Sequence, residues 1–273
     1  MILVTGAHGA LASTILAELD ARGVPAVGGT RTPAAGQRYV DFDDPARLDL
    51  GGTDVLVLVS AGYAEDDRVV ARHRAVLDAA RRDGVRSVVY TSVTTGGDHL
   101  AFALAHRVTE RMLRDSGLAW TILRNGLYAE LFGALLRWSA DGLESAFGTG
   151  SLAAVTRADL AAAAASVAAA PRSHTSRTYD LVGVPVTATD VADHLGVVHR
   201  TIGLGEYRDR LLADPLLLPF QPPMLHSIAS AVRHGVLSGT GPDLAGLLGR
   251  AATDPLPFAV AAATAGRAVS ARP

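Results

Sequence analysis

A turn containing two glycines near the start of the chain most constrains what this sequence can fold into. The apolar run 1–4 predicts a short strand, and apolar residues at helical spacing from Leu11 predict a helix directly after the turn. Gly6 would permit the tight turn, Gly9 would let a pyrophosphate approach the backbone, and Ala12 would let the helix lie close to a sheet. The helix N-terminus would then offer free N–H groups to phosphates. The pattern predicts a dinucleotide-binding site. The residues expected around the phosphates are Gly6, His8, Gly9, Ala10 and Leu11.

Strand and helix signals continue to alternate over the first part of the chain. The run 54–59 is continuously apolar after Asp54, as expected of a central parallel strand that is buried on both faces. The alternation predicts an α/β fold with a doubly wound parallel Rossmann sheet. The other expected strands are 25–30, 38–40, 86–91, 119–123 and 178–182. The expected helices are 66–84, 98–116 and 157–170, with Asp98 as the N-cap of the second.

The pattern loosens beyond Arg124, and this part is expected to supply a small, mostly helical substrate-binding lobe. The chain, 1–273, is long enough for one large α/β domain with such an appended lobe. We expect the lobe and a lid to be drawn mainly from 126–155 and 183–258. Segment 131–145 is expected to be helical within it.

Three further segments lie in the C-terminal third. Thr187 is expected to cap a helix that runs to Leu195. The apolar, proline-rich stretch 216–225 is typical of a loop, which is either buried under its neighbours or forms a flap over an apolar ligand. From about Thr264 the chain is expected to fray.

The composition excludes several classes of function. The net charge is −2, which offers no basic field for nucleic acid, and no apolar run is long enough to span a membrane. The chain has no cysteine, which excludes disulfides and thiolate metal sites and favours a cytoplasmic protein. The nine histidines form no metal-binding pattern, so no metal is expected. All 25 basic residues are arginine, so Schiff-base chemistry through a lysine is excluded. The expected partner is a small molecule, and the sequence does not indicate the oligomeric state.

The end of the second expected strand indicates which nucleotide binds. NAD-binding proteins usually place an acidic residue there for the ribose hydroxyls, whereas this chain has Thr30-Arg31-Thr32. A guanidinium suits a 2′-phosphate because its fork donates two charge-assisted hydrogen bonds, so Arg31 predicts NADPH. Further along, Asp41 and Phe42 are expected at the adenine edge. The residues expected near the middle of the cofactor are Ser60, Ala61 and Gly62.

Longer motifs extend the pattern over nearly the whole chain. They are Thr5-Gly6-x-x-Gly9, Gly84-Val85-Arg86 before Tyr90-Thr91-Ser92, His106-Arg107-x-Thr109-Glu110, the run from Ser116 to Glu130, Thr156-Arg157-Ala158-Asp159 and Leu247-Leu248-Gly249-Arg250. With these motifs the chain resembles the atypical short-chain dehydrogenase/reductases, and more narrowly the NmrA-like group that includes type 2 NAD(P)H:quinone oxidoreductases. The run Leu123-Arg124-Asn125-Gly126-x-Tyr128 is the most specific of them. The resemblance implies a Rossmann core, use of NADPH, and a substrate cleft roofed by the C-terminal lobe.

The chain departs from the usual chemistry of that superfamily. Ordinary members carry Tyr-x-x-x-Lys on the long helix after the fifth strand, where the tyrosine gives a proton to the carbonyl oxygen. When Glu110 is aligned with the glutamate that follows this pair, the two positions become Phe102 and His106. A spacing of four keeps both on one helix face. A phenylalanine cannot donate a proton, and His106 could hold a ribose by hydrogen bonds without being a permanent cation.

A few polar residues at strand ends remain as candidates for catalysis. Ser92 stands where the family has its catalytic serine, and Asn125 and Tyr128 follow the sixth expected strand. Thr91 and Ser92 are also expected against the cofactor, together with His106. The residues expected to contact the substrate are Phe102, Tyr128, Leu216, Phe220 and Met224.

Three functions therefore stay open. The first is NADPH-dependent reduction of a ketone of a polycyclic aromatic polyketide, assisted by a phenol of the substrate, as in antibiotic biosynthesis. The second is a quinone reductase, because a quinone that accepts hydride becomes a stabilised phenolate and needs no strong enzymic acid. The third is a non-catalytic redox sensor or regulator that binds NADP. The apolar segment 216–225 favours a small-molecule acceptor.

Overall fold

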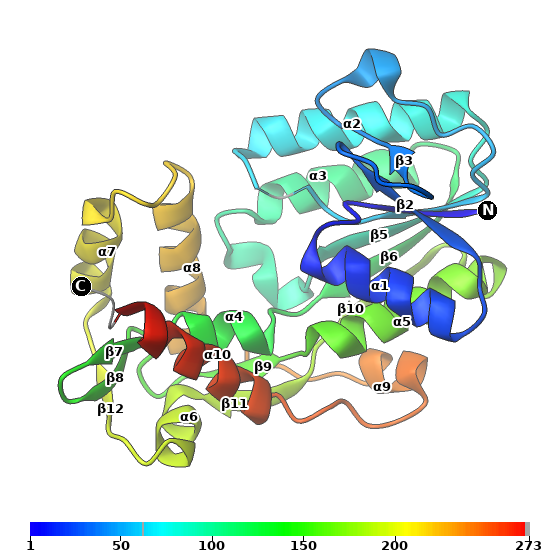
Figure 1. Ribbon diagram of the computed structural model, residues 1–273. Coiled ribbons are helices and arrows are strands. Elements are labelled where there is room, and N and C mark those ends of the chain that lie inside the picture. Colours follow the sequence, from blue (N-terminus) through cyan, green and yellow to red (C-terminus); the bar gives the residue numbers. More distant parts are fainter. Residues whose placement is uncertain (62, 271–273) are drawn as a thin grey trace.

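The centre of the molecule is a seven-stranded parallel sheet (Figure 1). The computed structural model describes residues 1–61 and 63–270. The strands lie in the order β10-β6-β5-β4-β1-β2-β3, and every neighbouring pair is parallel. Because the chain winds in opposite directions from β1, the doubly wound Rossmann fold is confirmed. The bounds are β1 (Ile2–Thr5), β2 (Ala26–Thr30), β3 (Arg38–Tyr39), β4 (Val55–Leu58), β5 (Ser87–Val93), β6 (Ala119–Asn125) and β10 (Arg177–Leu181).

The sheet is covered by helices on both faces (Figure 1). On one face α1 (Ala10–Ala21) packs against α5 (Arg157–Ala169), and Ile15 and Leu19 are fully buried there. On the other face lie α2 (Asp66–Arg82) and α3 (Ala103–Arg114). Each buried leucine or isoleucine stabilises the fold by about 1.5–3 kcal/mol. The sheet is thus a rigid platform, and the loops that follow its strands at one edge are held in fixed positions.

Local sequence signals explain where the flanking helices begin and end. α2 carries acidic residues in its first turn and arginines in its last turn, which complements the helix dipole. It ends before Gly84, whose φ of +74° is the left-handed conformation that glycine adopts without strain. Thr156 caps α5, because its side chain accepts a hydrogen bond from the Asp159 N–H. Thr187 forms a capping box with Asp190 at the start of α6 (Ala188–His194), as predicted.

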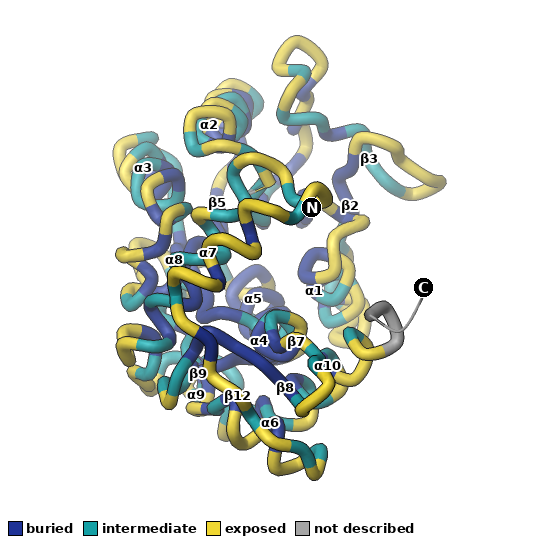
Figure 2. The backbone as a smooth tube through the Cα atoms, turned by 90° about the vertical axis from the view of Figure 1, so that its left-hand side faces the viewer, coloured by how far each residue is buried: buried dark blue, intermediate teal, exposed yellow. Residues whose placement is uncertain are grey.

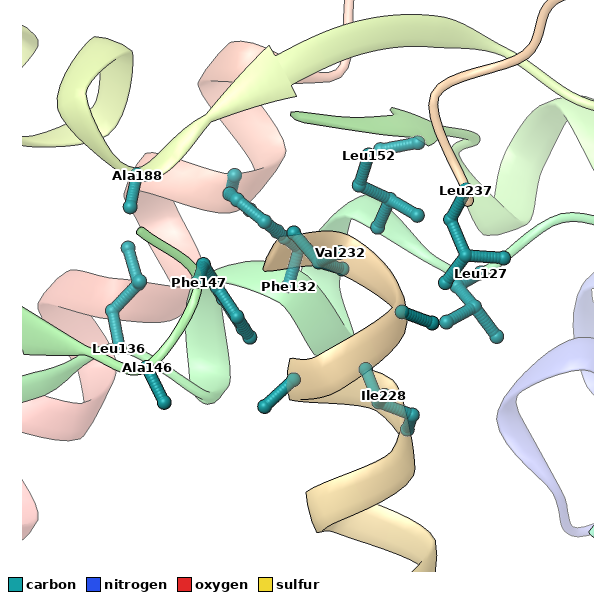
Figure 3. Packing of buried hydrophobic residues seen from close by; sticks show 14 of the residues in the cluster. Leu127, Phe132, Leu136, Ala146, Phe147, Leu152, Ala188, Ile228, Val232 and Leu237 are labelled. Atoms are coloured by element: carbon teal, nitrogen blue, oxygen red, sulfur yellow. The ribbon is translucent and has the colours of Figure 1, made fainter. Parts of the chain in front are cut away.

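The remaining elements form a second group around their own apolar cluster. Phe132 and Phe147 stack at its centre with ring centroids 4.9 Å apart, and Ile228, Val232 and Leu237 pack around them (Figure 3). Two small sheets, β11-β9 and β12-β8-β7, lie in this group. Its helices are α4 (Ala129–Ala134), α6, α7 (Leu204–Ala213), α8 (Gln221–Arg233) and α10 (Leu256–Ser270). Its strands are β7 (Arg137–Ser139), β8 (Gly142–Ser145), β9 (Ser151–Ala154), β11 (Val184–Thr187) and β12 (His199–Thr201).

Four short elements lie in the connections between the longer ones. They are the 3₁₀ turns η1 (Pro45–Arg47), η2 (Thr95–His99) and η3 (Pro171–His174), and the helix α9 (Asp243–Leu248). α5 is buried along most of its length, whereas the loop between α7 and α8 is largely exposed (Figure 2). No helix in the described ranges 1–61 and 63–270 has the length and apolar character needed to cross a membrane.

Two predicted helices are wrong in part. Segment 131–145 holds the short helix α4 followed by the hairpin β7–β8, in which Ser139 pairs with Gly142. Ala140 and Asp141 form the two-residue turn of this hairpin, and Gly142, which follows them, has a φ of +132° that glycine adopts without strain. The helix predicted from Asp98 starts at Ala103, with Phe102 as its N-cap. Asp98 lies instead in the 3₁₀ turn η2 (Thr95–His99), which ends before α3 begins.

The C-terminal third also differs from the prediction. The chain does not fray at Thr264, because α10 continues to Ser270. Ala259 and Ala263 of this helix are fully buried, and a Cβ at Gly133 of α4 would lie 2.0 Å from the Ala259 carbonyl oxygen. This close helix contact keeps the segment helical. The predicted loop 216–225 ends at Phe220, where α8 begins.

Candidate active site

The glycine turn between β1 and α1 has the geometry of a phosphate cradle. Gly6 has a φ of +69°, and the Gly9 N–H donates to the Gly6 carbonyl oxygen at 2.7 Å. A Cβ at Gly9 would lie 3.1 Å from that oxygen, so any side chain there crowds the turn. Gly9 caps α1 without a side-chain hydrogen bond, and Gly6, Gly9 and Ala10 are exposed. The first N–H groups of α1 therefore face outward, and the predicted cradle fits a dinucleotide pyrophosphate.

A cationic side chain follows β2 beside this turn. His8 lies over the strand end, with Nε2 3.3 Å from Gln37 Oε1 and Nδ1 3.4 Å from Thr30 Oγ1. Arg31 is exposed, and its charge helps to lower the pKa of Asp43, although the two side chains form no ion pair within 4 Å in the described ranges. Its guanidinium is therefore accessible to an anion beside the glycine turn. A free arginine at this place fits the extra phosphate of NADPH.

The predicted adenine edge lies after β3. Asp41 accepts a hydrogen bond from the Asp43 N–H at 3.0 Å, which tightens this loop. Asp43 in turn accepts two hydrogen bonds from Arg72 of α2, at 2.9 and 2.7 Å. Phe42 is half-buried against the apolar cluster beneath the sheet. The loop is thus fixed to α2, and Asp41 and Phe42 stay predictions for adenine binding.

The backbone after β4 is held by three side chains of neighbouring elements. Thr5 Oγ1 accepts from the Val59 N–H, and Thr91 Oγ1 accepts from the Ser60 N–H, each at 3.0 Å. The Ala61 N–H donates to His73 Nε2 of α2, also at 3.0 Å. Thr91 therefore positions the loop through its oxygen, and its role against the cofactor stays a prediction. The Ser60 hydroxyl is buried and has no hydrogen-bond partner among the described residues, and Gly62 lies outside them.

Ser92 belongs to a buried ionic cluster centred on Glu110. Its hydroxyl donates to Glu110 Oε1 at 2.7 Å, and the serine is only 4% exposed. Arg124 contacts both carboxylate oxygens of Glu110, at 2.9 and 2.7 Å, and Arg107 and Arg114 add further ion pairs. Burial alone would raise the pKa of Glu110, but the hydrogen bonds from Arg124 and Ser92 lower it to about 2. The Ser92 hydrogen is therefore committed to Glu110, which weakens the prediction that it is a catalytic donor.

Phe102 and His106 lie on one face of α3, as their spacing predicts. Their ring centroids are 6.3 Å apart, and Phe102 packs against the apolar cluster of the C-terminal group. His106 is half-buried, and its Nδ1 lies 2.8 Å from the hydroxyl of Tyr90 on β5. Burial lowers the pKa of His106 to about 4, so the imidazole is neutral at pH 7. The cation that lysine supplies in the usual pattern is therefore absent at this position.

Asn125 and Tyr128 follow β6. Asn125 is buried, and its Oδ1 has no hydrogen-bond partner among the described residues. The ring of Tyr128 lies 4.9 Å from the Arg157 guanidinium, and burial raises the pKa of its hydroxyl. Since a buried amide oxygen normally has a partner, the unpaired Oδ1 of Asn125 marks a place where a ligand group fits. Both residues stay candidates for contacting the cofactor or the substrate.

The segment between α7 and α8 reaches the loop after β4. Phe220 meets Tyr63 edge to face, and Gln221 Nε2 donates to the Tyr63 hydroxyl at 3.1 Å. Leu216 is 88% exposed, and Met224 is half-buried on α8. The C-terminal group therefore touches the Rossmann core beside the expected middle of the cofactor, and apolar side chains line this side.

Sequence reasoning gave no role to four residues that shape this region. They are Tyr63, His73, Tyr90 and Glu110. Two of them, Tyr90 and Glu110, lie in the motifs quoted above, and their place in those motifs was the sequence signal that could have found them. Tyr63 and His73 contact elements that are far apart in the sequence, so no local sequence pattern predicts these contacts.

Comparison with known proteins agrees with this geometry. Residues 6–171 match the model of a family described as NAD(P)H-binding. The chain is 37% identical to Quinone oxidoreductase 2 of Escherichia coli (strain K12) over 203 residues, which cover 67% of this chain and 68% of that protein. It is 29% identical over 92% of its length to the (4-alkanoyl-5-oxo-2,5-dihydrofuran-3-yl)methyl phosphate reductase of Streptomyces griseus, 94% of which is covered.

Solved structures show the same likeness over almost the whole chain. The NADPH complex of the NADPH-dependent quinone oxidoreductase of Escherichia coli superposes with a TM-score of 0.82 and 30% identity, covering 95% of this chain and 98% of that one. The triphenylmethane reductase of Citrobacter sp. in complex with NADP(H) gives a TM-score of 0.84 and 28% identity, covering 96% and 99%. The chain therefore belongs to the NAD(P)H-binding, NmrA-like family of atypical short-chain dehydrogenase/reductases and is an oxidoreductase that uses NADPH.

Proposed function

We propose that this protein reduces a quinone-type acceptor with NADPH. NADPH supplies the hydride when it is bound. The protein binds and orients the acceptor beside it and needs no acid of its own. Hydride added to a quinone gives a hydroquinone monoanion, and one proton from water completes the hydroquinone.

The observation that carries this proposal is the lack of a proton donor at the usual place. Phe102 stands at the position of the catalytic tyrosine, and the Ser92 hydroxyl donates to Glu110. The neutral His106 has a pKa of about 4 and is a poor proton source for an alkoxide at neutral pH. An acceptor that becomes a stabilised anion avoids this difficulty, because the negative charge is delocalised within the product.

The acceptors named for the relatives support the same chemistry. They are a quinone, a triphenylmethane compound and a furanone that carries an alkanoyl group. A quinone and an alkanoyl furanone are conjugated electrophiles, so the negative charge left by hydride transfer is delocalised and the product needs little help from an acid. The apolar side chains of Phe220, Leu216 and Met224 suit a flat, apolar molecule of this kind.

A second candidate is a polycyclic aromatic ketone of the polyketide type. A phenol next to the carbonyl would hydrogen-bond to it and pass on its own proton as the hydride arrives, and the phenolate would regain a proton from water. The missing enzymic acid favours such a substrate as well. The apolar segment 216–225 offers several large apolar side chains that could contact a molecule with fused rings.

One assay distinguishes these functions. The purified protein is mixed with NADPH and with benzoquinones, naphthoquinones or anthracyclinone- and angucyclinone-type ketones, and both NADPH oxidation and the product are measured. Hydroquinone formation supports the first function, and a secondary alcohol with no quinone turnover supports the second. Binding of NADPH without turnover of any acceptor overturns both and favours the non-catalytic regulator.

Two variants test the absence of an enzymic acid. We expect Ser92→Ala and Tyr128→Phe to keep turnover within a few-fold of the unmodified protein. Loss of turnover in either variant, with NADPH binding retained, would show that the protein supplies the proton after all.

A further inference from the structure

The core contains a tyrosine–histidine pair that the proposed reaction does not use. Tyr90 is fully buried on β5, and its hydroxyl lies 2.8 Å from His106 Nδ1. The two ring centroids are 6.1 Å apart. His106 is half-buried, and its ring lies between Tyr90 of the core and Phe102, which packs against the C-terminal group.

The burial of Tyr90 decides which partner donates. Among the described residues, His106 Nδ1 is the hydrogen-bond partner that lies within 3.5 Å of the Tyr90 hydroxyl, and the Ser60 and Thr109 hydroxyls lie farther off. If the imidazole donated from Nδ1, the phenol hydrogen would be buried without an acceptor, at a cost of about 1–3 kcal/mol. The phenol therefore donates to Nδ1.

The neighbouring hydroxyls do not change this assignment. Thr109 Oγ1 donates to the Ala105 carbonyl oxygen at 2.8 Å and lies 2.8 Å from His73 Nδ1. Because the Ala61 N–H donates to His73 Nε2, the neutral His73 carries its hydrogen on Nδ1 and donates it to Thr109. The Ser60 hydroxyl lies near the phenol oxygen, and hydrogen bonding from this side opposes the burial that raises the pKa of Tyr90, so the phenol hydrogen is still directed to His106.

A neutral imidazole carries one hydrogen, so in His106 it resides on Nε2. This nitrogen has no partner among the described residues and is not one of their buried unpaired atoms. It therefore faces the open side of the ring and is available to a ligand.

We propose that Tyr90 is a positioning residue that fixes His106 in the Nε2–H tautomer and orients it as a neutral donor to a hydroxyl oxygen of the bound nucleotide. This proposal rests on the proposed function for the placement of the nucleotide against α3. The donor replaces the lysine of the usual pattern with a single directed N–H. A sugar hydroxyl is the fitting acceptor, because the glycine turn and Arg31 already provide donors for the phosphates.

The first test reads the tautomer directly. The protein is labelled with ¹⁵N-histidine, and long-range ¹H–¹⁵N correlations are recorded at pH 7 without nucleotide, with His106 assigned by its loss in the His106→Gln variant. We expect hydrogen on Nε2 and an unprotonated Nδ1. Hydrogen on Nδ1 of His106 overturns the proposal.

The second test uses a matched pair of variants. The molecule has another such contact, in which the Tyr179 hydroxyl lies 2.8 Å from His174 Nδ1. Tyr179 lies on the edge strand β10, and His174 lies in η3 just before it. We expect Tyr90→Phe to change the His106 signals and to raise the Kd for NADPH roughly 3- to 10-fold, the equivalent of one hydrogen bond. Tyr179→Phe should change neither. Unchanged His106 signals and an unchanged Kd in Tyr90→Phe overturn the proposal.

A third comparison holds even if Tyr90→Phe does not fold. The amide nitrogen of glutamine reaches about as far as Nε2 of histidine, whereas that of asparagine reaches only as far as Nδ1. We expect His106→Gln to weaken NADPH binding less than His106→Asn, and the reverse order contradicts the assignment. These readouts need no acceptor, so they fail or succeed independently of the acceptor assay.

Discussion

The rings of Tyr63 and Phe220 pack edge to face, with ring centroids 5.2 Å apart and an interplanar angle of 87°. Tyr63 follows β4 in the Rossmann core, and Phe220 precedes α8 in the C-terminal group. The hydrogen bond from Gln221 to the Tyr63 hydroxyl supports the same contact. Since Tyr63 lies close to the expected middle of the cofactor, this pair forms an apolar wall at the place where an acceptor would approach.

Removal of the Phe220 ring should weaken acceptor binding without affecting the nucleotide. An aromatic pair contributes about 0.5–1.5 kcal/mol beyond its buried area. We therefore expect Phe220→Ala to raise the KM for a naphthoquinone roughly 3- to 10-fold and to leave the Kd for NADPH unchanged. Steady-state kinetics and fluorescence titration measure the two quantities.

Leu212→Ala is the control, because Leu212 is 67% exposed on α7, outside this contact. A Phe220→Ala variant that lost NADPH affinity while keeping its acceptor KM would place the ring against the nucleotide instead.

The fold was predictable where the signal is local. The buried run of β4 and the left-handed Gly84 after α2 are properties of adjacent residues, so the sheet and its helices followed from the sequence. The hairpin β7–β8 was missed because the apolar residues around Trp138 also fit a helical spacing. Tertiary contacts of Trp138 favour the hairpin over a helix. One of them is the hydrogen bond from its indole N–H to the Ala263 carbonyl oxygen at 2.8 Å.

The residues of the candidate site were likewise predictable where their role depends on local geometry. Gly6 and Gly9 act through their own backbone geometry, so the phosphate cradle could be predicted. The role of Ser92 depends on Glu110, which is 18 positions away, and that of Tyr63 depends on Gln221, which is 158 positions away. A motif shows that such residues matter but does not show whether they contact a ligand or one another.

Arg31 should distinguish the two nicotinamide nucleotides. Charge-assisted hydrogen bonds to a phosphate are worth about 1.5–3 kcal/mol, so Arg31→Ala should raise the Kd for NADPH roughly 10- to 100-fold. The Kd for NADH should change little, because NADH lacks the 2′-phosphate. Arg81→Ala, at the exposed C-terminal turn of α2, is the matched control. Equal losses for both nucleotides would contradict the role assigned to Arg31.

Gly9 can be tested against a glycine in the same backbone conformation. Gly9 caps α1 with φ −77° and ψ 148°, and Gly203 caps α7 with φ −71° and ψ 149°. A Cβ at Gly203 meets nothing within 4 Å, whereas one at Gly9 lies 3.1 Å from the Gly6 oxygen and occupies the cradle. Gly9→Ala should therefore weaken NADPH binding about tenfold or more, and Gly203→Ala should not. Similar affinities for NADPH in the two variants would place the phosphates elsewhere.

Glu110 should make the stability of the protein depend on pH under acidic conditions. Its pKa is about 2 in the folded state, below the ordinary value of 4.5, because arginines hold the buried carboxylate ionised. A lowered folded-state pKa gives stability that is present above about pH 4.5 and is lost as the pH falls toward 2, by an amount on the order of 3 kcal/mol.

The same carboxylate can be neutralised by mutation. Glu110→Gln leaves Arg107, Arg114 and Arg124 without their shared anion and should lower the free energy of unfolding at pH 7 by about 3–5 kcal/mol. It should also remove the share of the acid-dependent loss that comes from Glu110, because the glutamine does not titrate. Urea unfolding at pH 7 and pH 3 measures both effects, with Glu18→Gln, from an exposed pair with Arg22, as the control. If the variant kept the full acid dependence of the unmodified protein, another carboxylate would have to be its source.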